Sequence, residues 1–170
     1  SLAGVTLVIL VNLMAEPKPE VRPEIGDVAW KRDFEGSLAE SAETGKPVLA
    51  FFQEVPGCAG CQKFGQEVLT HPLLVEAIES EFVPVLIFNN QLGKDREILE
   101  RYKEPAWNYQ VIRFLDDKGR DLIPRKDRIW TLPQLAPRLM AALEAAERPV
   151  PTYLRALADE SARDRHVRTA

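Results

Sequence analysis

A run of five apolar residues, 48–52, constrains the fold of this chain more than any other sequence feature. The run follows Pro47, has the length of a β-strand and contains aromatic and β-branched side chains. Because a strand points alternate side chains to opposite faces, a continuous apolar run must be covered on both faces. Such strands lie in the centre of α/β sheets. A second apolar run, 82–88, predicts a neighbouring strand.

Helical patterns flank and separate these strands. Phe34, Leu38 and Ala42 are four residues apart and Gly45 follows, which predicts an amphipathic helix with a C-terminal glycine. A strand at 111–115, a turn and a returning strand through Leu122 and Ile123 predict an antiparallel hairpin. The first two strands have helical crossovers and should be parallel, so the order predicts a mixed α/β sheet. Further helices are expected directly after residue 61 and at 73–80, 93–102, 132–147 and 152–164.

Composition places the chain among soluble globular proteins. It has 170 residues, of which 45% are hydrophobic and 28% charged, enough apolar material for a substantial core. The net charge is −4, so no basic field exists to attract phosphates, and we expect no nucleic-acid partner. At ~150 residues a domain, length predicts about one domain. We place it at 27–150, followed by a C-terminal helix and polar tail at 151–170.

The first fifteen residues are uncharged and rich in Leu and Val. This apolar run has the length of a signal peptide and falls short of the ~20 residues that span a bilayer. Residues 16–26 contain Pro17, Pro19 and Pro23, which predicts an extended linker. We interpret 1–26 as a signal or anchor segment with a proline-rich linker, and expect a periplasmic or membrane-anchored extracytoplasmic protein. The alternative is a cytoplasmic protein in which 5–11 forms a buried strand or helix.

The two cysteines of the chain, Cys58 and Cys61, lie between the first predicted strand and a predicted helix. With Cys58 at the start of that helix, its sulfur would meet free backbone N–H groups and the positive end of the helix dipole, which favour the thiolate. Cys61 shares a helix face with Phe64 and Val68, so it should be the more buried of the two. An exposed nucleophile beside a sheltered resolving thiol is the geometry that thiol exchange requires.

Other roles for the cysteine pair fit less well. A structural disulfide here would close a four-residue loop and contribute only about 2 kcal/mol. A zinc site needs about four nitrogen or sulfur ligands, and the histidines of the chain are His71 and His166. His71 precedes Pro72 and is interpreted as a helix-end residue. A CxxC pair also occurs by chance, but its position between a strand and a helix favours redox chemistry.

On these features, 30–146 resembles thioredoxin-fold proteins, in the branch with a loop such as Val55-Pro56-Gly57-Cys58-Ala59-Gly60-Cys61. The resemblance implies a central mixed sheet of four or five strands flanked by helices. It also implies a monomer that exchanges thiols and disulfides with protein substrates through Cys58, with Cys61 as the resolving cysteine and no cofactor. Some bacterial relatives join such a module to further domains. Substrate-binding residues are expected near the motif and in the facing loop: Pro56, Gly57, Trp107, Asn108, Tyr109 and Gln110.

Two positions depart from the thioredoxin pattern. Thioredoxins have a cis-proline before the strand that faces the CxxC motif, and that position falls on Gln110 here. The proline shapes the substrate groove and keeps metal from the cysteines, so its absence favours metal binding somewhat. Thioredoxins also carry a buried acid in the strand before the motif, and 48–52 has none. Glu54 and Glu67 are the candidates to replace it.

The sequence therefore predicts a thiol–disulfide oxidoreductase, with Cys58 as nucleophile and Cys61 as resolving cysteine. The alternative from another class is a metal-binding or redox-sensing module that uses the same sulfurs with little turnover. A third possibility is a domain that binds a partner through its groove and retains little chemistry.

Overall fold

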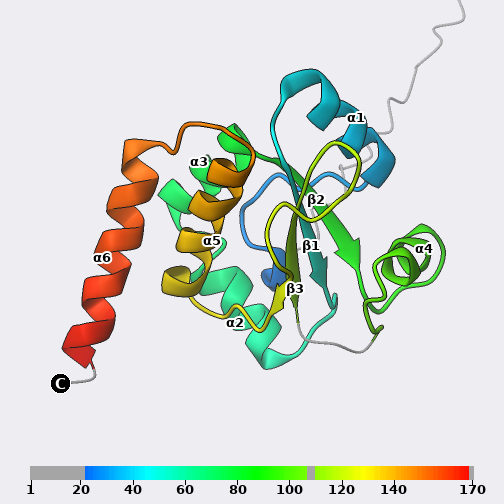
Figure 1. Ribbon diagram of the computed structural model, residues 1–170. Coiled ribbons are helices and arrows are strands. Elements are labelled where there is room, and N and C mark those ends of the chain that lie inside the picture. The colour runs from blue at the N-terminus through cyan, green and yellow to red at the C-terminus, as the bar shows by residue number, and fades with distance from the viewer. Residues whose placement is uncertain (1–21, 107–109, 169–170) are drawn as a thin grey trace, which may run out of the picture.

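A computed structural model describes residues 22–106 and 110–168, with side chains of the last helix described up to Glu160. Its sheet has the order β2-β1-β3-β4, in which β1 and β2 are parallel and the other two pairs are antiparallel. The mixed sheet predicted from the sequence is thereby confirmed (Figure 1). The four strands are β1 (Val48–Gln53), β2 (Val83–Phe88), β3 (Val111–Leu115) and β4 (Lys126–Asp127).

Helices cover both faces of the sheet. On one face, α1 and α4 enclose one apolar cluster, while α2, α3 and α5 enclose a larger one on the other face (Figure 1). The last helix, α6, packs against α5 and α3 on the side away from the sheet. The helices are η1, a 3-10 turn (Pro23–Ile25), α1 (Phe34–Thr44), α2 (Ala59–Glu67), α3 (Pro72–Glu81), α4 (Lys94–Arg101), α5 (Leu132–Ala145) and α6 (Thr152–Arg168).

The central strand β1 is buried along its entire length. Leu49 and Phe51 belong to the cluster under α2, α3 and α5, and Phe52 belongs to the cluster under α1 and α4. Each fully buried side chain of this size stabilises the fold by about 1.5–3 kcal/mol relative to an exposed one. Coverage of both faces is what the continuous apolar sequence predicted.

The predicted end of α1 at Gly45 is confirmed, and the structure adds a cap at its start. Asp33 caps the helix, because its side chain accepts a hydrogen bond from the N–H of Gly36. Gly45 ends it with a φ of 70°, a left-handed conformation that favours glycine, and donates its N–H to the Ser41 carbonyl. The chain then enters β1 directly.

The returning strand of the hairpin differs from its prediction. Regular pairing with β3 occurs at Lys126 and Asp127 instead of at Leu122 and Ile123. The N–H of Leu122 still donates to the Phe114 carbonyl. Pro124 has no N–H to contribute to a ladder, so regular pairing resumes only after it.

The end of the predicted linker is part of the folded domain. Residues 22–26 form η1 and its flanks, and η1 packs against α2. The N–H of Asp27 donates to the carbonyl of Leu69 just after α2. The apolar segment 1–15 lies outside the described residues. Among the helices of the described chain, none has both the length and the apolar character needed to cross a bilayer.

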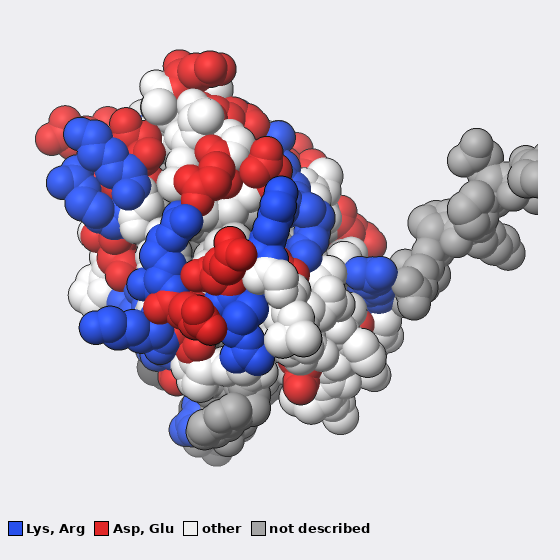
Figure 2. Space-filling view, turned by 90° about the vertical axis from the view of Figure 1, so that its right-hand side faces the viewer, with Lys and Arg blue, Asp and Glu red and all other residues white. Residues whose placement is uncertain are grey.

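A buried ion-pair network lies on the side of the sheet that α1 and α4 cover. Arg113 of β3 donates to Glu104 at 2.9 and 2.7 Å, and Arg125 donates to the same carboxylate at 2.7 and 2.8 Å. Burial alone would raise the pKa of Glu104, but hydrogen bonds from Arg125 and Arg113 outweigh it and lower the pKa overall. On the surface of this face, acidic and basic side chains interleave (Figure 2).

We expect Glu104→Gln to lower the free energy of unfolding by about 3 kcal/mol at pH 7, because it removes the buried carboxylate that pairs with both Arg113 and Arg125 and leaves Arg113 paired with the partly exposed Asp121. The matched control is Glu35→Gln, which removes an exposed pair with Arg101 and should cost less than about 1 kcal/mol. Urea unfolding of both variants measures the difference.

The pKa of Glu104 is lower in the folded protein than in the unfolded chain. The stability that Glu104 contributes is therefore fully present above its unfolded-state pKa and is lost as the pH falls through its folded-state pKa. Equal losses in both variants at neutral pH would contradict a stabilising role for the network.

Candidate functional site

The cysteine pair lies at the carboxyl end of β1, where a short loop leads into α2. Cys58 is the N-cap of α2 with extended backbone, and its Sγ accepts a hydrogen bond from the N–H of Cys61 at 3.4 Å. The sulfur therefore occupies the place that a capping oxygen takes in other helices. This is the helix-start position that the sequence predicted for Cys58.

The two sulfurs differ sharply in exposure. Cys58 is exposed, whereas Cys61 is 1% exposed and packs into the core on the same helix face as Phe64. Both are free thiols, with their Sγ atoms 3.0 Å apart. A disulfide bond is about 2.05 Å long, so a small movement of either side chain would allow one to form.

The same contacts separate the acidities of the two thiols. The hydrogen bond from the Cys61 thiol lowers the pKa of Cys58, and the backbone N–H groups of Cys61 and Gly60 add to that effect. Partial burial and the negative charge of Glu54 oppose it without reversing it. Burial, together with the hydrogen bond and the charge of the neighbouring Cys58, raises the pKa of Cys61 to about 12. At neutral pH, therefore, Cys58 is the thiol that ionises more easily.

Gly57 and Gly60, on either side of Cys58 in the sequence, lie in very different surroundings. A Cβ on Gly57 would overlap the carbonyl oxygen of Glu54 and lie 2.9 Å from the Cβ of Cys61. A Cβ on Gly60 would lie 3.5 Å from the Trp130 ring and 3.7 Å from the Cys58 Sγ, which is ordinary contact. The loop is thus closely packed at Gly57, whereas a side chain at position 60, in the first turn of α2, would meet the Trp130 ring at ordinary contact distance.

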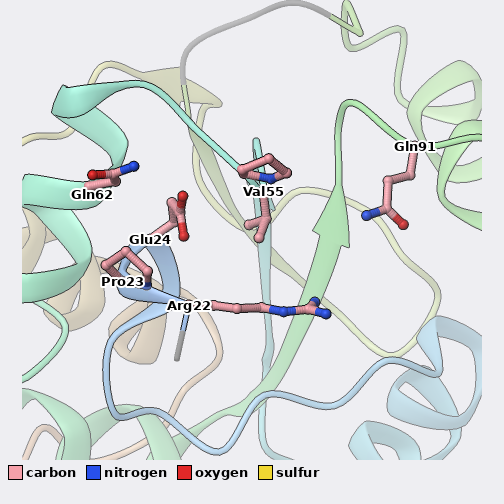
Figure 3. A pocket seen from close by; sticks show the side chains of 7 residues that line it. Arg22, Pro23, Glu24, Val55, Gln62 and Gln91 are labelled. Carbon is pink, nitrogen blue, oxygen red and sulfur yellow. The ribbon is translucent and has the colours of Figure 1, made fainter. Parts of the chain in front are cut away.

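A cavity of about 340 Å³ borders the loop before Cys58. Figure 3 shows the Glu24 carboxylate and the Gln62 amide on one side of it and Gln91 on the other. The Gln62 amide also donates to the Gly57 carbonyl at 3.3 Å, so one wall of the cavity is attached to the loop. The lining residues are Arg22, Pro23, Glu24, Val55, Pro56, Gln62 and Gln91.

Sequence reasoning missed a buried acidic residue that is hydrogen-bonded to the loop. Glu24 is 2% exposed, and its Oε1 accepts a hydrogen bond from the N–H of Gly57 at 2.8 Å. Of the two candidates named from the sequence, Glu67 is exposed and lies 3.9 Å from Lys63. Glu54 acts on both cysteines through its charge. No local pattern in a proline-rich segment signals that Glu24 is buried.

The structure brings some predicted substrate-binding residues to this site. Pro56 and Gly57 form the loop before Cys58. Gln110 is fully buried directly before β3, and its side-chain amide donates to the carbonyl of Ile129, the neighbour of Trp130. Residues 107–109, which comprise Trp107, Asn108 and Tyr109, lie outside the described residues. Sequence reasoning did not identify Trp130, whose only signal was an aromatic residue before a predicted helix.

The residues that the structure describes offer no third metal ligand near the sulfurs. In that part of the chain, no group of three or more His, Cys, Asp or Glu side chains is arranged to hold a metal ion. His71 is the N-cap of α3, as its interpretation as a helix-end residue predicted. The metal-binding alternative therefore has no supporting donor set among the described side chains.

At pH 7 we expect iodoacetamide to modify Cys58 at least ~10-fold faster than Cys61, because exposure and a lowered pKa both favour Cys58. Peptide mapping by mass spectrometry after timed quenching measures the two rates. In the control variant Cys58→Ser, Cys61 should stay unmodified until the protein is unfolded. Similar rates for the two cysteines in the folded protein would refute the assigned difference.

Alanine should be poorly tolerated at Gly57 and well tolerated at Gly60. Gly57→Ala should lower the free energy of unfolding by roughly 1–3 kcal/mol, because backbone and the Cys61 side chain occupy the required space. Gly60→Ala, in the first turn of α2, should change it by less than about 1 kcal/mol. Thermal unfolding with Cys58 alkylation rates tests both variants. Equal tolerance at the two positions would be inconsistent with this packing.

Comparison with known proteins agrees with this architecture. A family model described as thioredoxin-like matches residues 29–116, more than half of the chain. Among solved structures, the chain is similar to one described as DsbH oxidoreductase, with a TM-score of 0.57, 18% sequence identity and coverage of 76% of this chain and 94% of that one. At this identity the likeness supports the fold alone, and no curated protein matches the chain. The sheet order, the cysteine pair at the start of α2 and the family match together show that the chain belongs to the thioredoxin-like family.

Proposed function

We propose that this protein is a thiol–disulfide oxidoreductase that acts on protein thiols or disulfides, with Cys58 as nucleophile and Cys61 as resolving cysteine. The observation that carries the proposal is the difference between two adjacent sulfurs. One is exposed with a lowered pKa at a helix start, and the other is buried with a raised pKa 3.0 Å away. The family match is consistent with this class of activity, and the solved structure of similar fold is described as an oxidoreductase.

The reductive direction proceeds in two exchanges. The Cys58 thiolate attacks one sulfur of the substrate disulfide, a mixed disulfide forms, and the other substrate sulfur leaves as a thiolate. Cys61 then loses its proton and attacks Cys58 Sγ, which releases the second substrate thiolate and leaves a Cys58–Cys61 disulfide. The substrate gains two electrons and the protein loses two. The two sulfurs carry both electrons, so the exchange itself requires no cofactor.

The contacts of Cys61 explain why it acts second. Its pKa is raised by burial first and by the adjacent Cys58 second. When Cys58 becomes part of a mixed disulfide, its negative charge disappears, while burial remains. Loss of that charge makes Cys61 easier to deprotonate at the stage when its attack is needed.

The loop residues Pro56 and Gly57 are proposed to contact substrate beside Cys58. Trp107, Asn108 and Tyr109 are proposed to form the facing side of the substrate site. Gln110, which is fully buried, is proposed to support that side through its hydrogen bond to the Ile129 carbonyl. Trp130 is proposed to add an aromatic surface near Cys58 Sγ, which is supported by the fact that a Cβ at Gly60 would lie 3.5 Å from the Trp130 ring and 3.7 Å from that sulfur.

The direction of exchange depends on the compartment, because one dithiol runs either way against different redox poises. We propose an extracytoplasmic location, which is supported by the uncharged apolar run at 1–15.

A trapping experiment tests the proposed roles. Cys61→Ser, mixed with a disulfide-bonded protein such as insulin, should accumulate a mixed disulfide on Cys58, because the step that resolves it is lost. Non-reducing gel electrophoresis and mass spectrometry detect the adduct. The matched variant Cys58→Ser should form none, and the wild-type protein should reduce insulin without accumulating it. An adduct on Cys61 in the Cys58→Ser variant, or no reduction by wild-type protein, would count against the proposal.

A further inference from the structure

Glu24 holds both ends of the loop that presents Cys58. Its backbone carbonyl accepts a hydrogen bond from the side chain of Gln53, the last residue of β1, at 3.1 Å. Its side-chain Oε1 accepts from the N–H of Gly57, the residue before Cys58, at 2.8 Å. Glu24 is 2% exposed and Gln53 is fully buried, so water does not compete freely for these bonds.

Backbone packing sets where the Glu24 carboxylate lies. On α2, a Cβ at Gly65 would overlap the Pro23 carbonyl oxygen and lie 2.8 Å from the Glu24 Cα. Because residue 65 has no side chain, η1 can lie directly against the helix that Cys58 caps. The carboxylate is therefore carried to Gly57 by a segment whose position is fixed relative to α2.

We propose that Glu24 is a positioning residue for Cys58: its carboxylate oxygen holds the Gly57 N–H and thereby keeps Cys58 in the N-cap position of α2. The inference rests on the proposed function and adds a residue from the N-terminal segment to it. The N–H that Glu24 holds belongs to the peptide unit between Pro56 and Gly57, one residue before Cys58. A loop released there lets Cys58 leave the geometry in which its Sγ accepts the Cys61 N–H. That contact stabilises the thiolate.

The hydrogen bond and the charge of Glu24 predict opposite effects on Cys58. If Glu24 acts through its bond to Gly57, removal of the acceptor raises the pKa of Cys58, because the thiolate loses N–H contacts. If Glu24 acts as a nearby negative charge, removal of the charge lowers the pKa of Cys58, as a like charge disfavours the thiolate. The charge of Glu54 acts in this second way, because it raises the pKa of Cys58.

Two variants of matched size separate these cases. Glu24→Gln keeps a side-chain carbonyl that can accept from Gly57, whereas Glu24→Met fills the same space without an acceptor. The rate of Cys58 alkylation by iodoacetamide against pH, in the full chain, gives the pKa of Cys58. We expect Glu24→Met to raise that pKa by roughly 0.5–1 unit and Glu24→Gln to leave it within a few tenths of a unit. The control Glu54→Gln should shift the pKa downward.

A second variant covers the case in which Glu24→Met does not fold. Gln53→Met removes the other bond that holds the segment and leaves the carboxylate in place. It should raise the pKa of Cys58 in the same direction by a smaller amount, with circular dichroism confirming that the protein is folded.

Several results would overturn the positioning role. They are an unchanged alkylation profile in folded Glu24→Met and Gln53→Met, a fall in the pKa of Cys58 in Glu24→Met, or a shift in Glu24→Gln as large as in Glu24→Met. The last two outcomes would assign Glu24 a role through its charge or its proton instead. Failure of the wild-type protein to exchange with disulfides is a separate result, which would reject the proposed function and leave the alkylation measurement valid.

Discussion

Pairing of β1 with a neighbour on each side, β2 in parallel and β3 antiparallel, is the constraint on which the rest of the structure depends. The strand is buried on both faces, so its course through the molecule is set by two apolar clusters and two ladders at once. Its carboxyl end therefore emerges at a defined point, and the loop and α2 that follow begin from that point. A reactive group on the short loop that follows such a strand is held at a defined position.

The start of α2 gives its two cysteines different exposure and different pKa values. Cys58 meets the unpaired N–H groups of the first turn and remains exposed, which favours its thiolate. Cys61 lies one turn further along and faces the core, so burial disfavours ionisation there. The spacing of three residues both separates the environments and keeps the sulfurs 3.0 Å apart. No further charged residue is needed to make the two thiols unequal.

Attachment of η1 to α2 shows how a segment remote in sequence becomes part of the site. Gly26 and Gly65 leave no room for side chains against Leu69 and the η1 backbone. This close approach places a buried carboxylate beside Gly57, although β1 itself carries no acid. The strand that precedes the cysteines can thus stay wholly apolar along 48–52.

The sequence by itself determined the central strands, the helix that ends at Gly45 and the unequal burial of the cysteines, because each depends on side-chain period or on residues a few positions apart. It could not place Glu24, Trp130 or the strand at Lys126 and Asp127. Burial of Glu24 depends on contacts with α2 and the loop after β1, and the Trp130 contact depends on where α5 begins relative to Gly60. Local periodicity contains no information about such long-range contacts. Only the tertiary structure decided them, since packing of backbone against backbone selects which distant residues meet.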